Sequence, residues 1–185
     1  MTLFSYACDT IRIEPLVAEH TEDIHIYAAK PHVKLYIGWP LMRTLAETTE
    51  HVQLFLERHQ KGSHIYCSVI EQTSGRVVGT GIVFNFDKAA GHAEIGYVLD
   101  DTVWGKGYGT QLVAILSQYA LKDLGLRKLY ARVVDENTGS ARVLTKNGYA
   151  LEAELKDFYR IDGRLMNCHI YSRYGDEFET GSVQL

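Results

Sequence analysis

The stretch that decides the fold reads Tyr97-Val98-Leu99-Asp100-Asp101-Thr102-Val103-Trp104-Gly105-Lys106-Gly107-Tyr108-Gly109-Thr110. The residues before it, from His92 to Leu99, are rich in Ile, Tyr and Val, which is typical of a β-strand. After it, apolar residues recur at three- and four-residue spacing as far as Leu124, which indicates an amphipathic helix that Gly125 ends. The stretch therefore predicts a strand, a glycine loop and a helix in direct succession.

The glycine loop predicts an anion site. Gly105, Gly107 and Gly109 leave the backbone uncovered where the helix begins, and the first amides of a helix have no partner inside the helix. Several amides together suit a pyrophosphate better than a single carboxylate, because charge-assisted hydrogen bonds contribute roughly 1.5–3 kcal/mol each. Glycines that only form a tight turn are the alternative interpretation.

Composition excludes several classes of protein. The chain has 185 residues, 46% of them hydrophobic, and a net charge of -4 without a run of Lys or Arg, so neither a nucleic acid nor a membrane is expected as a partner. Neither a signal peptide nor a membrane span is expected. Three unevenly spaced cysteines favour reduced thiols and the cytoplasm, with Cys67 and Cys168 as buried thiols. The eight histidines show no metal-ligand spacing, so no metal is expected.

The order of elements predicts an α+β (mixed α/β) fold, with one central, mostly antiparallel sheet of about seven strands and helices on both faces. The strand at His92–Leu99 and the strand at Lys128–Val134 are joined by a helix, so they should lie parallel. A parallel pair inside an antiparallel sheet can part at one end, and an extended ligand is expected in that opening. The chain is expected to be one domain, 1–185, with a core of about 10–174 and a polar, frayed tail at 175–185. The remaining expected strands are Thr10–Leu16, His64–Glu71, Arg76–Phe86, Tyr149–Arg160 and Arg164–Tyr174. The remaining expected helices are Thr21–Ala29, Thr44–Gln60 and Asn137–Asn147, and Thr21 is the expected cap of the first. The segment Pro31–Arg43 is expected to be a loop or a broken helix.

Three segments together resemble the GNAT acyltransferase superfamily, and more closely its RimJ/RimL-like branch, which acetylates amino groups including protein N-termini. They are Ala93 to Leu99, the loop Trp104 to Thr110, and Asn137 to Ser140 leading to Asn147-Gly148-Tyr149. The resemblance implies a GNAT-like fold and direct transfer of the acetyl group of acetyl-CoA to a primary amine of a protein N-terminus or small molecule. Trp104 departs from the family's usual Arg or Gln at its position, a replacement often seen in this branch.

The resemblance also implies which residues bind the acetyl-CoA. The backbone at Tyr97 and Leu99 would pair with the pantetheine arm, and the backbone from Lys106 to Thr110 would hold the pyrophosphate. Lys106 either adds charge there or is a solvated loop lysine. The implied cofactor-binding residues are Tyr97, Leu99, Trp104, Gly105, Lys106, Gly107, Tyr108, Gly109, Thr110 and Asn137.

Catalysis requires a base, because a protonated amine cannot attack a thioester. The resemblance implies Glu94, acting through water, and a positioned general base contributes about 10²–10⁴ in rate. The alternative is a sheet-face glutamate in a salt bridge. The backbone N–H of Leu99 would stabilise the oxyanion if the strand bulges there. The family's tyrosine acid is replaced by Leu144, and Ser140 resembles a serine that substitutes for it, unless Ser140 only caps its own helix. A thiol with a pKa near 8.5 also leaves without an acid.

The acceptor side is predicted from aromatic residues. If the resemblance holds, Tyr36, Trp39, Arg43 and Tyr159, with Arg160, border the acetyl end of the cleft. Trp39 is otherwise a core anchor. The acceptor itself stays open, and the expected assembly is a monomer or a homodimer.

Two other functions fit parts of the sequence. A dinucleotide-binding oxidoreductase shares the order of strand, glycine loop and helix. Thr110 stands where a third glycine or alanine belongs, however, and the chain after Asp135 is too short for further βαβ units. The other function is a non-catalytic, CoA-binding regulatory module, against which Glu94 and the intact glycine loop argue.

Overall fold

The computed structural model describes residues 5–175, so the expected tail lies outside the described residues beyond Gly175. One mixed sheet of eight strands runs through the molecule in the order β1-β2-β3-β4-β5-β6-β8-β7. The predicted α+β fold is confirmed, with one strand more than the expected seven. The extra strand, β1, has two residues, too few to show an alternating pattern. The strands are β1 Tyr6–Ala7, β2 Ile11–Pro15, β3 Ile65–Glu71, β4 Val77–Asp87, β5 His92–Leu99, β6 Lys128–Val134, β7 Ala150–Ile161 and β8 Arg164–Tyr174.

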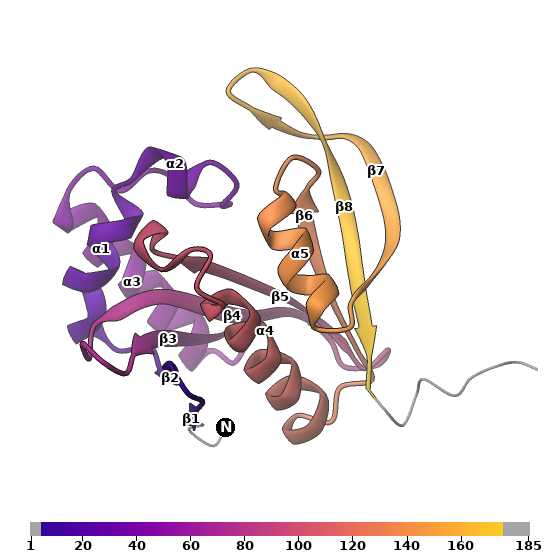
Figure 1. Ribbon diagram of the computed structural model, residues 1–185, viewed down its shortest axis with the longest axis horizontal. Helices are drawn as coiled ribbons and strands as arrows, with labels where there is room; N and C mark the ends of the chain where they lie inside the picture. Colours follow the sequence, from indigo (N-terminus) through magenta and orange to yellow (C-terminus); the bar gives the residue numbers. More distant parts are fainter. Residues whose placement is uncertain (1–4, 176–185) are drawn as a thin grey trace, which may run out of the picture.

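The helices lie on both faces of this sheet (Figure 1). They are α1 Thr21–Ala28, α2 Pro31–Lys34, α3 Leu45–Gln60, α4 Tyr108–Gln118 and α5 Thr138–Lys146, with 3₁₀ turns η1 Ala18–His20 and η2 Asp101–Val103 and a π-helical turn η3 Tyr119–Asp123 that extends α4. Helices α1 and α3 pack with Tyr66 and Val98 in one apolar core. Helix α4 covers the other face, where Leu112 and Leu116 pack in a second core. None of the helices in residues 5–175 is long and apolar enough to cross a membrane.

Capping residues explain where α3 and α5 begin. Thr44 and Glu47 form a reciprocal capping box at the start of α3, and the Asn137 side chain caps α5. The expected cap at Thr21 is wrong. Thr21 is the first residue of α1, and its hydroxyl donates back to the carbonyl of Ala18, because the preceding 3₁₀ turn already sets the start of the helix.

The predicted parallel pair is confirmed, and it parts at one end. Strand β5 pairs with β6 only from His92 to Glu94, opposite Lys128 to Tyr130. Beyond Glu94, β5 stays paired with β4 as far as Leu99, whereas β6 continues with β8. The edge of β5 from Ile95 to Leu99 is therefore open toward the gap between the two strands.

The hairpin of β7 and β8 projects beyond α5, opposite the segment around α2 (Figure 1). Its turn, Asp162-Gly163, has φ values of 47° and 81°. Both residues thus adopt the left-handed conformation that a type I′ hairpin turn requires, as the sequence predicts.

Candidate active site

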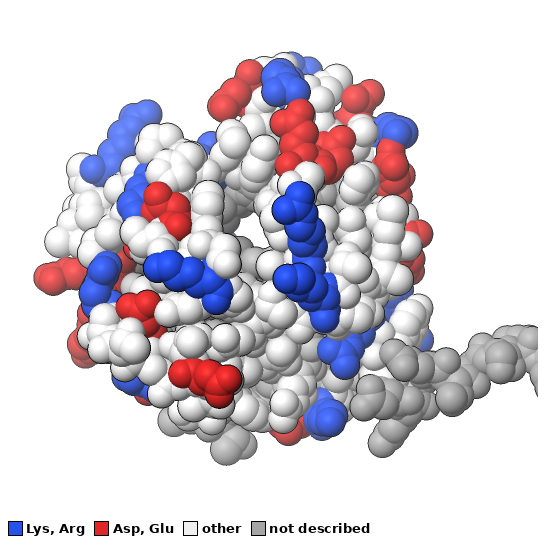
Figure 2. Space-filling model, viewed as in Figure 1, with Lys and Arg blue, Asp and Glu red and all other residues white. Residues whose placement is uncertain are grey.

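A cavity of about 760 Å³ lies where β5 and β6 part. Its walls come from the segment 34–40, α3, β4, β5, β6, the start of α5 and the end of β7. Figure 2 shows the hollow in the middle of the face between the α2 region and the β7–β8 hairpin. The structure thus brings together elements that are distant in the sequence around one opening.

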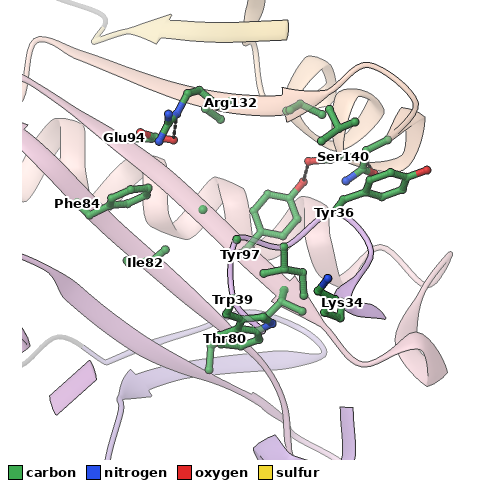
Figure 3. A pocket seen from close by; sticks show the side chains of 18 of the residues that line it. Lys34, Tyr36, Trp39, Thr80, Ile82, Phe84, Glu94, Tyr97, Arg132 and Ser140 are labelled. Carbon is green, nitrogen blue, oxygen red and sulfur yellow. Dashed lines mark hydrogen bonds and ion pairs between the residues drawn. The ribbon is translucent and has the colours of Figure 1, made fainter. Parts of the chain in front are cut away.

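Glu94 lines this cavity and is 4% exposed. Its Oε1 accepts a hydrogen bond of 2.8 Å from Nε of Arg132, and its Oε2 accepts one of 2.8 Å from the Asn85 amide (Figure 3). The salt bridge considered as the alternative role of Glu94 is therefore present. A carboxylate has about four lone-pair sites, and two of them are used here, so Glu94 can still accept a proton. Its role as the base stays a prediction.

Two partners of Glu94 were missed from the sequence. Asn85 lies in a bulge of β4 with φ 51°, which turns its amide onto the carboxylate across the strands. An asparagine inside a strand is itself a signal, because asparagine is depleted in strands and tolerates the left-handed region. Bulges also concentrate beside active sites. For Arg132 the sequence signal is weaker, and consists only of a charged residue inside the apolar strand β6.

Successive side chains of β5 point to opposite faces of the sheet. Val98 packs with α3, so Glu94, which has the same parity, points toward the α3 face. Tyr97 points the other way, and its hydroxyl lies 2.8 Å from Oγ of Ser140 on α5 (Figure 3). The two polar side chains of β5 therefore serve opposite sides of the opening.

Ser140 does not cap its own helix through its hydroxyl. Its backbone N–H donates to Oδ1 of Asn137, at 3.1 Å, which leaves the hydroxyl for Tyr97. Burial raises the pKa of Tyr97 to about 12, so this hydroxyl stays protonated. Leu144, which stands where the resemblance implies a tyrosine acid, is fully buried in the core. The sequence predicted a role only for the backbone of Tyr97. Its side chain adds a second hydroxyl beside that of Ser140.

The role considered for the Leu99 N–H in stabilising the oxyanion required a bulge at Leu99, and β5 has none there. Strand β5 keeps regular register with β4 from Glu94 to Leu99, because the adjoining Gly79 and Gly81 admit the close approach of β5 and the core. The N–H of Asp100 donates to the carbonyl of Val78 on β4. Because the backbone groups of successive strand residues point to opposite sides of the strand, those of Tyr97 and Leu99 point away from β4 and face the opening. The carbonyl of Leu99 accepts from the indole N–H of Trp104 at 2.9 Å.

The glycine loop leaves the start of α4 open. Gly107 is the N-cap at φ 86°, and no side chain caps the helix. The first-turn amides of Tyr108, Gly109 and Thr110 are thus orphan donors, and Lys106 beside them is exposed. The side chain of Tyr108 points away and donates to Glu71 at 2.8 Å, so only its backbone can bind a ligand.

Gly109 has a packing role in addition to its place in the loop. A Cβ at this position would lie 3.2 Å from Cγ2 of Val143 on α5 and 3.5 Å from Leu99. The third glycine therefore permits close packing of α4 against α5. Leu99 and the loop residues 104–110 do not themselves line the 760 Å³ cavity. They come directly after Tyr97 and Val98 of β5, which do line it.

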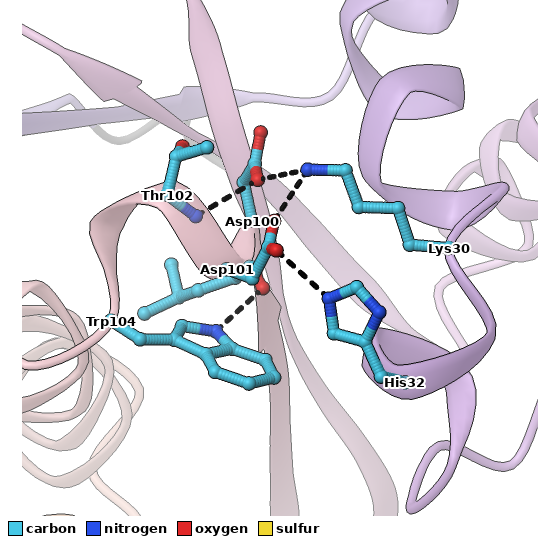
Figure 4. Close-up of polar contacts among 7 residues, drawn as sticks. Lys30, His32, Asp100, Asp101, Thr102 and Trp104 are labelled. Carbon is cyan, nitrogen blue, oxygen red and sulfur yellow. Dashed lines mark hydrogen bonds and ion pairs between the residues drawn. The ribbon is translucent and has the colours of Figure 1, made fainter.

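A polar network ties this loop to the segment around α2 (Figure 4). Nζ of Lys30 bonds to Asp100 at 2.7 Å and also to Asp101, and Nε2 of His32 lies 2.8 Å from Oδ2 of Asp101. Asp100 is 1% exposed, and a buried carboxylate needs such a partner. Trp104 packs edge-on against His32, with ring centroids 6.0 Å apart.

The predicted acceptor residues divide into two groups. Tyr36, Trp39 and Tyr159 line the cavity, together with Arg160. Trp39 also stacks on Phe55, with centroids 5.7 Å apart, so it is both a wall residue and a packing anchor. Arg43 does not line the cavity. Its backbone N–H donates to Glu47 at the start of α3, and a role for Arg43 in binding the acceptor stays a prediction.

The cysteine interpretation is confirmed for the two strand residues. Cys67 and Cys168 are buried free thiols, and burial raises the pKa of Cys67 to about 12. Within residues 5–175, no three His, Cys, Asp or Glu side chains gather as they would around a metal ion.

Comparison with known families matches residues 10–150 to the acetyltransferase (GNAT) domain. The dinucleotide-binding alternative is wrong, since this sheet is antiparallel apart from one pair of strands. Among the relatives, an uncharacterized N-acetyltransferase, p20 of Bacillus licheniformis, is 26% identical over 92% of this chain and 96% of its own.

Solved structures share the fold. A RimL ribosomal L7/L12 alpha-N-protein acetyltransferase in complex with coenzyme A superposes with a TM-score of 0.85 at 21% identity, covering 95% of this chain and 99% of that one. The spermidine N-acetyltransferase of Vibrio cholerae, in complex with CoA and spermine, gives 0.80 at 17% identity, covering 91% and 97%. At these identities the likeness establishes the fold.

Proposed function

The chain belongs to the GNAT acetyltransferase family, and from this premise we propose that it moves the acetyl group of acetyl-CoA directly to a primary amine of a protein N-terminus or a small molecule. The observation that carries the proposal is the opening between β5 and β6, which has Glu94 on one face and the Tyr97–Ser140 pair on the other. A base and a hydroxyl donor on opposite sides of one opening suit a transfer in which the two substrates enter from opposite faces.

The cofactor end is built from backbone. Acetyl-CoA supplies an activated acetyl group as a thioester. The parted edge of β5 offers the N–H and C=O groups of Tyr97 and Leu99 to an extended arm, and the uncapped amides of α4 offer donors to a pyrophosphate. Lys106 adds a cation beside them, and Asn137 lines the cavity between the two sites.

On the acceptor face, Glu94 takes the proton that the amine loses as its nitrogen forms the new C–N bond. Its ion pair with Arg132 fixes the carboxylate at the cavity wall. Because both oxygens already accept hydrogen bonds, a bridging water is the natural route for the proton.

On the other face, the C–S bond breaks and the leaving sulfur takes up negative charge. A tyrosine with a pKa of about 12 is a poor acid for a thiolate whose conjugate thiol has a pKa near 8.5, since a complete transfer is uphill by roughly 5 kcal/mol. We therefore assign Tyr97, with Ser140, the role of hydrogen-bond donor to the thiolate, which leaves as the anion and equilibrates with protons of the buffered solvent after release.

The proposal is tested by a thiol-release assay with acetyl-CoA as donor, over peptides with free N-termini, polyamines and aminoglycosides. We expect release with at least one amine class, and a rise in melting temperature with acetyl-CoA but not with NAD, because only ligands of the native state stabilise it. Silence with every amine, together with stabilisation by acetyl-CoA, would favour a non-catalytic CoA-binding module.

Three further expectations belong to this proposal. The chain acts in the cytoplasm, it acts as a monomer or a homodimer, and residues 1–185 form one catalytic domain. The reduced cysteines and the shared cavity support the first and the last of these.

A further inference from the structure

The charges around the cavity restrict the acceptor. Its lining holds four cations, Lys34, Arg58, Arg132 and Arg160, against two carboxylates, Glu94 and Asp162. Arg132 and Glu94 neutralise each other at 2.8 Å. The other three cations form no ion pair with a carboxylate in the described part of the chain. The acceptor side therefore carries an excess of positive charge, although the whole chain has a net charge of -4.

Arg58 lies on the α3 wall of the cavity. It lies one helical turn after Phe55 on α3, is partly buried, and donates a hydrogen bond to the Tyr66 hydroxyl. Burial, and then the charge of Arg58, lower the pKa values of His51 and His64. Both histidines are thus neutral at neutral pH, and Arg58 is the charge that a ligand meets on this wall.

A row of stacked rings connects Arg58 with Glu94. Phe84 lies directly opposite Glu94 across β4 and β5, and its ring is 5.9 Å from that of His64, which is 5.7 Å from that of Tyr66. Beyond Tyr66, the row continues through Phe55 to Trp39, both of which also line the cavity. Figure 3 shows Phe84 and Trp39 on this wall, with Lys34 at its rim.

The length of this row sets the spacing of the ligand's charges. Two ring-to-ring steps of 5.9 and 5.7 Å separate Phe84 from the ring that Arg58 contacts. An extended chain covers about 3.3–3.6 Å per residue, so this reach takes about three residues. An amine at Glu94 and an anionic group near Arg58 are thus further apart than the two ends of a single α-amino acid.

The buried polar atoms also favour an acceptor that carries oxygen atoms. The indole N–H of Trp39 and Nε2 of His51 are buried without a hydrogen-bond partner in residues 5–175, and their rings lie 5.2 Å apart on the same wall. A buried donor without a partner is costly. Carbonyl and carboxylate oxygens would satisfy it after a small adjustment of the segment 34–40, whereas a polyamine has no such oxygen.

We propose that the acceptor is the free N-terminus of a polypeptide whose first few residues carry Asp or Glu side chains, recognised by Arg58 and by Lys34 and Arg160 at the rim. The inference rests on the proposed acetyltransferase function. Lys34 and Arg160 come from opposite sides of the mouth, the α2 segment and β7, so an acidic chain leaving the cavity passes between them. A polycation meets three unpaired positive charges, against the single carboxylate of Asp162, and this excess of like charge disfavours its entry.

The test compares peptides of one length that begin with Ser and differ only at the second to fourth residues, which are Glu, Gln or Lys. We expect kcat/KM to fall in that order, by about tenfold or more in total, and the advantage of the Glu peptide to shrink as salt is added. Spermidine and 6-aminohexanoate are the small-molecule arms.

The Arg58→Gln variant should lower kcat/KM for the Glu peptide by about 10- to 100-fold and leave the Gln peptide within about twofold. Lys88→Gln, which removes an exposed cation in the β4–β5 turn outside the cavity lining, should change neither. Lys34→Gln, at the rim, is the second variant if Arg58→Gln does not fold. It should lower kcat/KM for the Glu peptide and leave kcat/KM for the Gln peptide unchanged.

Several results would overturn this inference while the acetyltransferase function stands. They are a preference for the Lys peptide or for spermidine, an equal loss for the Glu and Gln peptides in Arg58→Gln, or a preference for 6-aminohexanoate over every peptide. No acetylation of any amine, despite binding of acetyl-CoA, would overturn the proposed function and this inference with it.

Discussion

The two ends of the cavity are built in different ways. At the cofactor end, the end of β5, the glycine loop and the start of α4 follow one another in the chain and present mainly backbone groups. At the acceptor end, Arg58, Phe84, Glu94 and Tyr159 come from α3, β4, β5 and β7 and present side chains. A site made of consecutive backbone groups is set by local conformation, whereas a site made of side chains exists only when the sheet has assembled.

The difference shows where substitutions should act. Changes in the loop should weaken acetyl-CoA binding and local stability, and changes on the acceptor face should alter turnover and selectivity. The network of Lys30 with Asp100 and Asp101 ties the cofactor end to the segment that leads into α2. Three predictions separate the ends, beginning with the largest effect.

Glu94→Gln should lower kcat/KM about 10²–10⁴-fold while acetyl-CoA binding stays intact, because the amide cannot accept the amine's proton. Steady-state kinetics and a separate binding titration measure the two quantities. The matched control is Arg132→Gln, which breaks the same ion pair from its other side. If both variants lose turnover equally, the ion pair and not the base carries the effect, and unchanged turnover in Glu94→Gln removes the base assignment.

Gly107→Ala should destabilise the cofactor end by about 1–2 kcal/mol, since the residue lies at φ 86° in the left-handed region. Affinity for acetyl-CoA should fall with it, because the loop amides lose their arrangement. Urea unfolding and an acetyl-CoA titration measure both. The control is Gly139→Ala, where the nearest atom to the added Cβ is 3.7 Å away and φ is not left-handed. Equal effects of the two variants would show that the left-handed position does not matter.

The acceptor end should lose more stability in mild acid than the cofactor end, and the difference in free energy should be roughly 1 kcal/mol or less. Burial, followed by the charge of Arg58, lowers the pKa values of His51 and His64, so the unfolded chain binds more protons than the folded one below the unfolded value of about 6.5. The stability that these two histidines contribute is therefore constant above that pH and falls as pH decreases through it. Hydrogen exchange at about pH 7.5 and 5.5 should show loosening in α3 and not in α4. An equal response in both helices would contradict the assignment.

Much of the fold was accessible from the sequence. Alternating strands, capping residues such as Thr44 and Asn137, and the Asp162-Gly163 turn are local signals, and they placed the main elements, the meander and the parallel pair. The errors also have local causes. A two-residue strand has no period, and Thr21 is displaced from its cap by a preceding 3₁₀ turn.

The residues missed at the site are those whose partners are distant in the chain. Asn85, Arg132 and the Tyr97 hydroxyl acquire their roles from contacts across strands or between β5 and α5. Arg58, similarly, becomes a candidate receptor for an anion because β3 and β4 place a row of rings between it and Glu94.

The sequence by itself determined the glycine loop, the strand before it and the helix after it, because these features depend on backbone conformation within one short stretch. The expectation of a CoA-binding acetyltransferase came from the resemblance of this stretch, together with Ala93 to Leu99 and Asn137 to Tyr149, to the GNAT superfamily. Only the tertiary structure decided that Glu94 is paired with Arg132, that Tyr97 faces Ser140, and that the acceptor wall is cationic. Side-chain partners and the sign of a local field depend on which distant strands and helices meet, and no spacing along the chain specifies that meeting.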